Sequence, residues 1–364
     1  MAQTNPSSTA ESRQKYQTLL AETRAIQGVS LGKDAWRQLR KNRGAMLGLA
    51  ILCIVSLVAA MTPLLPLQSP RWQELKTRQL LPPGITRVQL PANPKLPELW
   101  TNPGPVTTAL IRVRLAVFGG WCLPSLCGTD NLGRDSLARI CWGLRVSLLV
   151  GLVAASVSLV IGVSWGAIAG YAGGAVDRVM MRIVDILNSI PFIFIVIFLV
   201  TVLTEESIKK RLESWGIGQI TILYVAIGAF YWLTMARVVR GQVLSLKHEQ
   251  FVDAARTIGA SHLRIIFLHL VPNVLGLVIV YLTLTIPSVM LTEAFLSFLG
   301  LGVQAPDVSL GVLVNEGIGV ITPVRIYWWL VFFPGLTLAV TLLALNQLGD
   351  GLRDALDPRL KNRD

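Results

Sequence analysis

The residue types that most often carry chemistry are scarce in this chain, and their spacing does not suit catalysis. The three histidines, His248, His262 and His269, fall within one short stretch, and the last two lie on one face of a predicted helix rather than around a metal ion. The four cysteines form no Cys-x-x-Cys pair for zinc or redox chemistry. No phosphate-binding loop, nucleophile elbow or His-Glu-x-x-His helix is present. We therefore expect a non-catalytic chain that binds no metal and no cofactor itself.

Composition indicates a membrane protein. Of the 364 residues, 52% are hydrophobic and 15% are charged, whereas about a quarter of a soluble domain is charged. The 33 Lys and Arg exceed the 21 Asp and Glu, for a formal net charge of +12. These basic residues are scattered between long apolar runs. A nucleic-acid-binding protein would instead gather them, together with aromatic residues, on one folded surface that faces water. This distribution favours membrane lipid, and not nucleic acid, as the partner.

Six apolar stretches are long enough, or nearly so, to cross a hydrocarbon core, which takes roughly 20 helical residues. The first begins too far from Met1 to be a cleaved signal peptide, so it is expected to remain as an anchor. Pro287 and Pro334 are expected to kink the fifth and the sixth of these stretches. The sequence therefore predicts an all-α integral membrane protein with six transmembrane helices. The stretches run from about Gly44 to Leu65, Val146 to Tyr171, Ile183 to Leu203, Ile217 to Met235, Val271 to Leu291 and Tyr327 to Leu348.

Charge in the connections predicts the orientation. Residues 1–43 hold eight Lys or Arg and the connection 236–270 holds five, whereas the connection between spans five and six holds only Arg325. The positive-inside rule then places both termini and the 236–270 connection in the cytoplasm. The long loop after the first span holds ten Lys or Arg, but loops of that length cross the membrane largely regardless of their charge. In that outer loop Cys122 and Cys127 are either disulfide-bonded or free thiols, and the sequence leaves both open.

These assignments divide the chain into consecutive segments. We expect a cytoplasmic N-terminal tail (1–43), a first transmembrane helix (44–66), an extracytoplasmic loop (67–145), a five-helix core (146–350) and a cytoplasmic C-terminal tail (351–364). Within the first segment, residues 34–43 alternate apolar and basic side chains. That pattern suits a helix lying at the lipid headgroups, although a basic flank that only sets topology explains it equally well.

The loop between spans four and five reads as two short helices that meet at a bend. In the first, Phe251, Ala254 or Ala255, and Ile258 make a narrow apolar face. Gly259 can adopt the left-handed conformation that ends a helix, and Ser261 can cap the next one. The second helix has its own apolar face, of Leu263, Ile266, Phe267 and Leu270, and reaches Pro272. Such a loop either enters a groove of another protein or caps the bundle of its own chain.

Several motifs resemble one transporter family. Asp253-Ala-Ala-x-x-x-Gly259, followed by His269-x-x-Pro272, resembles the Glu-Ala-Ala-x-x-x-Gly signature of permease subunits of bacterial ABC importers. The resemblance extends over about 44–65 and 128–360, to the C-type permease of the dipeptide/oligopeptide/nickel branch. It implies the type I ABC importer permease fold. The further segments that carry it are Gly128–Asp135, Asp185–Pro191, Arg237–Ser245, Glu293–Pro306 and Leu348–Leu360.

The resemblance also implies partners and a location. The chain would form half of a heterodimeric pore in the bacterial cytoplasmic (inner) membrane, beside a second homologous permease subunit. Two ABC ATPase subunits would bind ATP and Mg²⁺, and an extracytoplasmic solute-binding protein would deliver the substrate. Within the coupling loop 246–272, the docking residues implied are Phe251, Val252, Asp253, Ala254, Ala255, Arg256, Gly259, Ala260 and Ser261.

Two further groups are candidates for the outer gate or the pore. Asp130, Arg134 and Asp135 precede span two, where a simple capped surface helix explains the spacing nearly as well. Glu293, Phe295 and Phe298 follow span five, in a segment apolar enough to dip back into the membrane, although each aromatic suits core packing equally.

The chain departs from the family pattern in three places. Asp253 stands where the family usually has Glu, the segment 66–126 is longer than usual, and Leu310 stands where many relatives have Trp. Di- or oligopeptides are the expected substrates, with nickel or another small solute as the alternative. An ion-coupled secondary transporter would need ionisable residues within its spans and often shows inverted repeats, but these spans are nearly free of charge.

Overall fold

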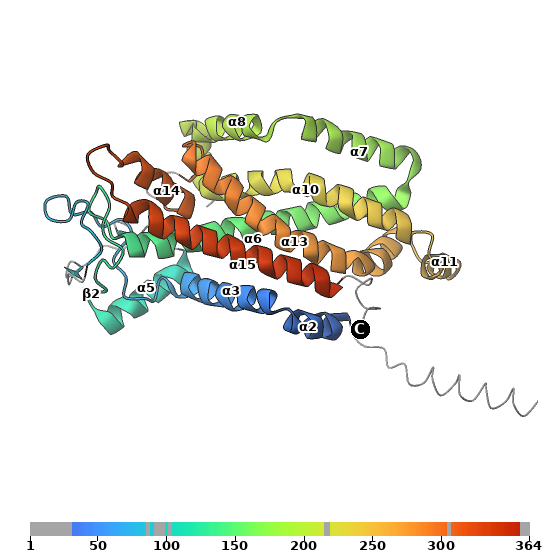
Figure 1. Ribbon diagram of the computed structural model, residues 1–364. Coiled ribbons are helices and arrows are strands. Elements are labelled where there is room, and N and C mark those ends of the chain that lie inside the picture. The colour runs from blue at the N-terminus through green and yellow to red at the C-terminus, as the bar shows by residue number, and fades with distance from the viewer. Residues whose placement is uncertain are drawn as a thin grey trace, which may run out of the picture.

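The computed structural model describes residues 31–84, 88–90, 99–100, 104–214, 219–303 and 307–356. Long helices lie side by side, with the short helix α11 at one end (Figure 1). At the other end is a loop-rich region that we call the outer region, because the sequence predicts it to be extracytoplasmic. The N-terminal half comprises α2 (Leu31–Lys41), α3 (Arg43–Met61), α5 (Pro105–Phe118), α6 (Ser136–Ala172), α7 (Gly174–Ser189), α8 (Phe192–Thr204) and α9 (Glu206–Ser214). The rest comprises α10 (Gln219–Leu246), α11 (Gln250–Thr257), α12 (His262–Arg264), the π-helical turn η1 (Ile265–Leu270), α13 (Val271–Phe298), α14 (Leu310–Gly319) and α15 (Trp329–Leu356).

The described helices confirm an all-α chain with several membrane spans. Four are long and apolar enough to cross a bilayer: α3, α6, the continuous helix His262–Phe298, and α15. The pair formed by α7 and residues 192–199 of α8 makes a fifth if counted as one broken span. The fourth predicted span, Ile217–Met235, falls within α10 except for residues 217–218, which lie outside the described residues. Six spans therefore remain a prediction.

The third predicted span is not one straight helix. The sequence predicts a span over 183–203, but α7 and α8 meet at a bend of 78°. Pro191 stands at the break, and Ile190 before it is extended, with φ −82° and ψ 121°. A proline ring disfavours helical backbone at the preceding residue, which explains why the chain turns there.

Glycines hold α6 against α10. Gly162, Gly166 and Gly170 follow one another at every fourth position of α6, and all three face α10. A Cβ added to Gly166 would lie 2.4 Å from the carbonyl oxygen of Ala236, closer than atoms can pack. These small residues let the backbone of α10 approach that of α6 closely.

The helix that contains α13 differs from the prediction at both ends. It continues from His262 through η1 and past Pro272, because a π-helical turn immediately before a proline accommodates the missing N–H. It also extends to Phe298, so Glu293, Phe295 and Phe298 are helical and do not form a segment that dips back into the membrane. Gly300, with φ +76°, is the residue that ends it. The short apolar helix after it is α14.

A small outer region covers the beginning of α6. It contains α5 and a two-residue antiparallel pair of strands, β1 (Val88–Gln89) and β2 (Trp121–Cys122). The buried Arg114 of α5 donates hydrogen bonds to the carbonyl oxygens of Leu65 and Leu67, at 3.1 and 2.7 Å. These bonds fasten the outer region to the chain that leaves α3. Cys122 and Cys127, whose pairing the sequence left open, are free thiols.

Candidate functional site

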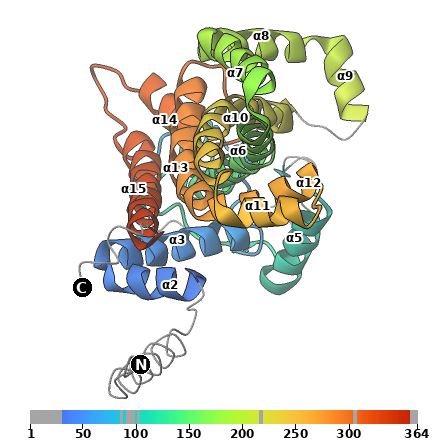
Figure 2. The same cartoon turned by 90° about the vertical axis from the view of Figure 1, so that its right-hand side faces the viewer.

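The loop at the α11 end presents two different faces. Val252 and Ala255 are buried in an apolar cluster formed with α6, α10 and α13. On the opposite side Phe251 and Ile258 are exposed, Ile258 to 83%. Figure 2, which views the molecule from this end, shows α11 lying across the ends of the long helices. One face of α11 therefore caps the bundle of the chain itself, which is one of the two alternatives left open by the sequence, and the other face is exposed.

The bend after α11 depends on a left-handed glycine. Gly259 has φ +78°, and its N–H donates to the carbonyl oxygen of Arg256 at 2.9 Å. The N–H of Ala260 donates to that of Ala255 at 3.0 Å, which completes a Schellman motif. Ser261 stands at the N-cap of α12 but makes no capping hydrogen bond with its side chain, so this part of the prediction was wrong.

Charged and aromatic side chains connect the loop to the end of α6. Asp253 and Arg256 form an exposed ion pair of 3.2 Å within α11. The Arg256 guanidinium lies 5.5 Å from the ring centroid of Tyr171, whose hydroxyl is 3.0 Å from Nδ1 of His262. Of the nine docking residues implied by the family resemblance, Val252 and Ala255 are buried and Ala260 is half-buried, while Phe251, Asp253, Ala254, Arg256, Gly259 and Ser261 are exposed.

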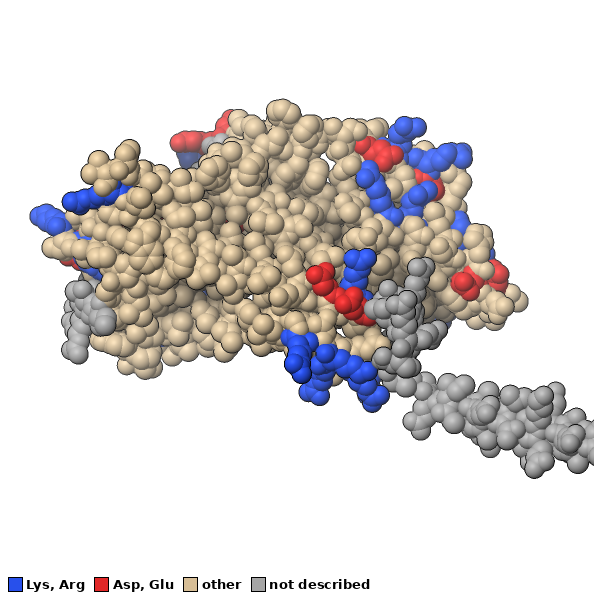
Figure 3. All heavy atoms as spheres, viewed as in Figure 1, with Lys and Arg blue, Asp and Glu red and all other residues tan. Residues whose placement is uncertain are grey.

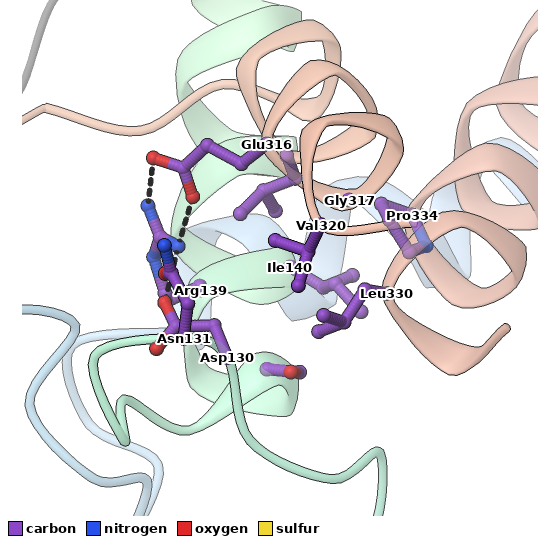
Figure 4. A pocket seen from close by; sticks show the side chains of 11 residues that line it. Asp130, Asn131, Arg139, Ile140, Glu316, Gly317, Val320, Leu330 and Pro334 are labelled. Atoms are coloured by element: carbon purple, nitrogen blue, oxygen red, sulfur yellow. Dashed lines mark hydrogen bonds and ion pairs between the residues drawn. The ribbon is translucent and has the colours of Figure 1, made fainter. Parts of the chain in front are cut away.

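At the opposite end of the molecule, Asp130, Arg134, Arg139 and Glu316 form a compact network of charged side chains. Figure 4 shows three of them, Asp130, Arg139 and Glu316. Oδ2 of Asp130 accepts from Nε of Arg134 at 2.6 Å and from Nη1 of Arg139 at 2.7 Å. Arg139 also donates to both carboxylate oxygens of Glu316 on α14, at 2.5 and 3.1 Å. Asp130, Arg139 and Glu316 line a small pocket of about 20 Å³ between α6, α14 and α15. The network therefore joins the start of α6 to α14.

The loop before α6 is shaped to present Asp130. Oδ1 of Asp130 accepts the backbone N–H groups of Leu132 and Arg134, each at 2.9 Å. Gly133, with φ +72°, could not carry a side chain, because a Cβ there would lie 2.3 Å from the carbonyl oxygen of Glu74. These local bonds hold the carboxylate in place so that it faces both arginines.

Asp135 has a different role from its neighbours. Its Oδ2 accepts the N–H of Ala138 at 2.9 Å, which caps α6 as a simple capped helix would require. The side chain is almost fully buried, and burial raises the pKa of its carboxyl to about 6.

Glu293 belongs to a second, separate polar cluster. It is 1% exposed, and its carboxylate accepts from Ser297 at 2.7 Å and from Ser147 of α6 at 3.3 Å. Ser147 in turn accepts the N–H of Leu310, the first residue of α14, at 3.2 Å. Phe295 and Phe298 are 57% and 50% exposed and contribute nothing to this cluster.

Sequence reasoning missed the residues that complete both outer clusters. Arg139 and Ser147 lie in an otherwise apolar helix, and Glu316 is the one acidic residue in α14. A charge isolated in an apolar helix is a usable signal, because it is costly unless it is paired. Among the described residues no group of three or more His, Cys, Asp or Glu side chains is arranged to hold a metal ion.

Comparison with known proteins gives two matches to family models. Residues 162–362 match the model described as binding-protein-dependent transport system inner membrane component. Residues 30–83 match the N-terminal TM domain of oligopeptide transport permease C.

Individual relatives match over nearly their whole length. The dipeptide transport system permease protein DppC of Bacillus subtilis is 39% identical over 92% of this chain and 87% of its own. The oligopeptide transport system permease protein OppC of Escherichia coli is 38% identical over 96% and 98%. A solved structure, of the MetNI methionine ABC transporter in an inward-facing conformation, covers 60% of this chain and 96% of its own, with 18% identity and a TM-score of 0.43.

Proposed function

Because this chain belongs to the family of binding-protein-dependent transport system inner membrane components, as a permease of an ABC importer, we propose that it forms half of a peptide-conducting pore. The relatives that cover most of the chain are named for dipeptide or oligopeptide transport, which supports that substrate class. Nickel or another small solute is the alternative.

The proposed assembly has this chain beside a second, homologous permease subunit in the bacterial inner membrane. Two ATPase subunits bind ATP and Mg²⁺ on the cytoplasmic side, and a solute-binding protein delivers the peptide from outside. The chain itself is a non-catalytic subunit. We assign it the type I importer fold with both termini in the cytoplasm. Its six spans are the five described above together with α10, which is the fourth along the chain. The excess of basic residues in 1–43 and 236–270 supports this orientation.

The observation that carries the proposal is the two-faced helix α11. Val252 and Ala255 anchor it among α6, α10 and α13, so a push on α11 acts directly on the long helices. Its other side exposes Phe251 and Ile258 beside the Asp253 carboxylate, as a helix that enters a groove of an ATPase requires. Such a contact couples closure of the ATPase subunits to movement of the pore.

At the outer end, the two polar clusters suit an extracytoplasmic gate. Arg139 and Glu316 join α6 to α14, while Glu293 and Ser147 join α13 to both. Charge-assisted hydrogen bonds of this kind have two discrete states, formed or broken, and so can hold α14 closed until the long helices move. Asp130 and Arg134 support the gate, and Asp135 caps α6.

Reconstitution tests this function. The complete transporter, with both permeases, the ATPases and the binding protein, is placed in proteoliposomes, and uptake of a labelled dipeptide, a labelled pentapeptide and ⁶³Ni²⁺ is measured with and without ATP. ATP-dependent uptake of either peptide supports the proposal. Uptake of nickel, with no uptake of either peptide, would make nickel the substrate in place of peptides. Uptake driven by an ion gradient without ATP, or purification of this chain without ATPase and second permease, overturns the assignment.

A further inference from the structure

A hollow rich in arginine lies between α7 and α10, near the end of the molecule that carries α11. Its volume is about 490 Å³, and the charged side chains that line it are Asp177, Arg178, Arg182, Asp185, Arg237 and Arg240. Four arginines against two aspartates give it a net charge of +2. Figure 3 shows basic and acidic side chains gathered at the upper right of the view, where Figure 1 places α7, whereas the upper middle of the same face is uncharged. The hollow is therefore an anion-attracting site.

Two of the four arginines are already paired. Arg240 donates to both carboxylate oxygens of Asp177, at 2.5 and 2.6 Å, and Arg237 donates to Asp185 at 3.0 Å. Both aspartates are thereby neutralised by α10. Arg178 and Arg182, one helical turn apart on α7, are exposed and make no hydrogen bond or ion pair with any other residue that the structure describes. Two guanidinium groups remain to bind an external anion.

The depth of the hollow corresponds to the lipid headgroups. The backbone of Arg240 lies against Gly170, two residues before the end of α6. α6 is one of the helices long and apolar enough to cross a bilayer, and it ends at Ala172. The hollow therefore lies at an end of the membrane-spanning region, within reach of a lipid phosphate.

The helix that carries the free arginines is also suited to lie beside acyl chains. Val176, Val179, Ile183 and Ile186 of α7 are all at least 40% exposed. Basic and exposed apolar residues on one helix at a membrane interface are typical of contact with anionic lipid. A soluble anion would gain nothing from this apolar stripe.

We propose that this hollow binds the phosphate of an anionic membrane lipid. The forked guanidinium groups of Arg178 and Arg182 match phosphate oxygens, and basic pockets between membrane helices on the cytoplasmic side bind such headgroups. The assignment of this end to the cytoplasm rests on the orientation proposed above. A bound lipid would hold α7 against α10, which leads through residues 247–249 into α11. The lipid would thus stabilise the helices that the coupling loop moves.

Lipid binding to the purified complete transporter tests the proposal. The transporter in detergent is titrated with phosphatidylglycerol, phosphatidylcholine or inorganic phosphate, and bound ligand is counted by native mass spectrometry. The variant Arg178→Gln/Arg182→Gln is expected to bind phosphatidylglycerol about 25-fold more weakly, since each basic residue near an anionic headgroup contributes roughly a factor of five. The control Arg325→Gln/Arg353→Gln removes two exposed charges elsewhere and is expected to bind as the parent does.

Each other result overturns the proposal in a distinct way. Equal binding by both double variants would show that the hollow is not the site. Inorganic phosphate that binds as tightly as phosphatidylglycerol would make the ligand a free anion. Loss of the second permease from the Arg178→Gln/Arg182→Gln complex would make the hollow a subunit interface. Because binding is counted without transport, a chain that binds the lipid but moves no peptide would contradict only the proposed function.

Discussion

Arg139 and Glu316, 177 residues apart in the chain, face each other with two parallel hydrogen bonds between guanidinium and carboxylate. Arg139 is 2% exposed, so its charge depends on this partner and on Asp130. Glu316 is 32% exposed, so one side of the pair is open to solvent. A buried charge that shares a partially hydrated partner can be released by a modest movement of α14, which is the property that an outer gate needs.

Removing the Glu316 charge is expected to destabilise the protein. Glu316→Gln leaves Arg139 with only Asp130, and we expect a loss of about 1–3 kcal/mol, below the full value for a buried pair because Glu316 is partly hydrated. Denaturant unfolding of the complete transporter, purified in detergent with the parent or the variant chain, measures the change. The control is Glu206→Gln, whose ion pair with Lys210 is exposed on both sides and should contribute almost nothing. Equal effects of the two substitutions would contradict a structural role for the Arg139 pair.

The bend at Gly259 is expected to be necessary for transport but not for folding. Gly259→Leu forces a branched side chain into a left-handed conformation, at a cost of about 1–2 kcal/mol, and shifts α11. We expect ATP-dependent uptake to be lost while membrane insertion and the unfolding midpoint of the bundle change little. Gly259→Asn should retain most of the uptake, because asparagine tolerates this backbone conformation.

The matched control for the bend is Gly276→Ala. Gly276 is helical and has no atom within 4 Å of where a Cβ would stand. This substitution should leave uptake unchanged. If Gly259→Leu transports peptide normally, the docking role of α11 is wrong.

The elevated pKa of Asp135 predicts a specific pH dependence of stability. The folded pKa of about 6 lies above the ordinary value of 3.8, so the folded state binds the proton more tightly than the unfolded state. Stability should therefore increase as the pH falls from about 7 towards 4, by roughly 2–3 kcal/mol in total. Asp135→Asn keeps a capping side chain but cannot ionise.

The difference between the two proteins measures this effect. Unfolding midpoints of the parent and of Asp135→Asn are compared between pH 5 and pH 8, and the advantage of the variant should grow with pH across the folded pKa. A difference that is independent of pH would show that Asp135 stays ionised in the folded protein throughout.

Close packing of α6 on α10 predicts a severe effect of enlarging Gly166. A Cβ at this position would overlap backbone atoms of α10 and not a flexible side chain, so the two helices must separate. We expect Gly166→Val to lower the free energy of unfolding by about 3 kcal/mol, the upper end of the usual range for overpacking. Size-exclusion recovery and the unfolding midpoint report it, with Gly276→Val as the control for a valine in an uncrowded helical position. Similar recovery of both variants would contradict the close approach.

Features that depend on neighbouring residues followed from the sequence alone. Apolar length predicted most of the membrane helices, and Gly259 predicted the bend after α11, because helix formation and left-handed glycines are local properties. The motif from Asp253 to Gly259 also pointed to the family. The break at Pro191 had a local cause as well, but length and hydropathy alone suggested an uninterrupted span.

Features that depend on distant residues needed the tertiary structure. Which of Ala254 and Ala255 is buried is decided by how α11 lies across α6, α10 and α13, and the structure buries Ala255. The pairing of Arg139 with Glu316, and of Arg237 with Asp185, joins separate helices whose relative rotation no local pattern determines. Local periodicity determines which side chains share a helix face, but only packing determines what that face meets.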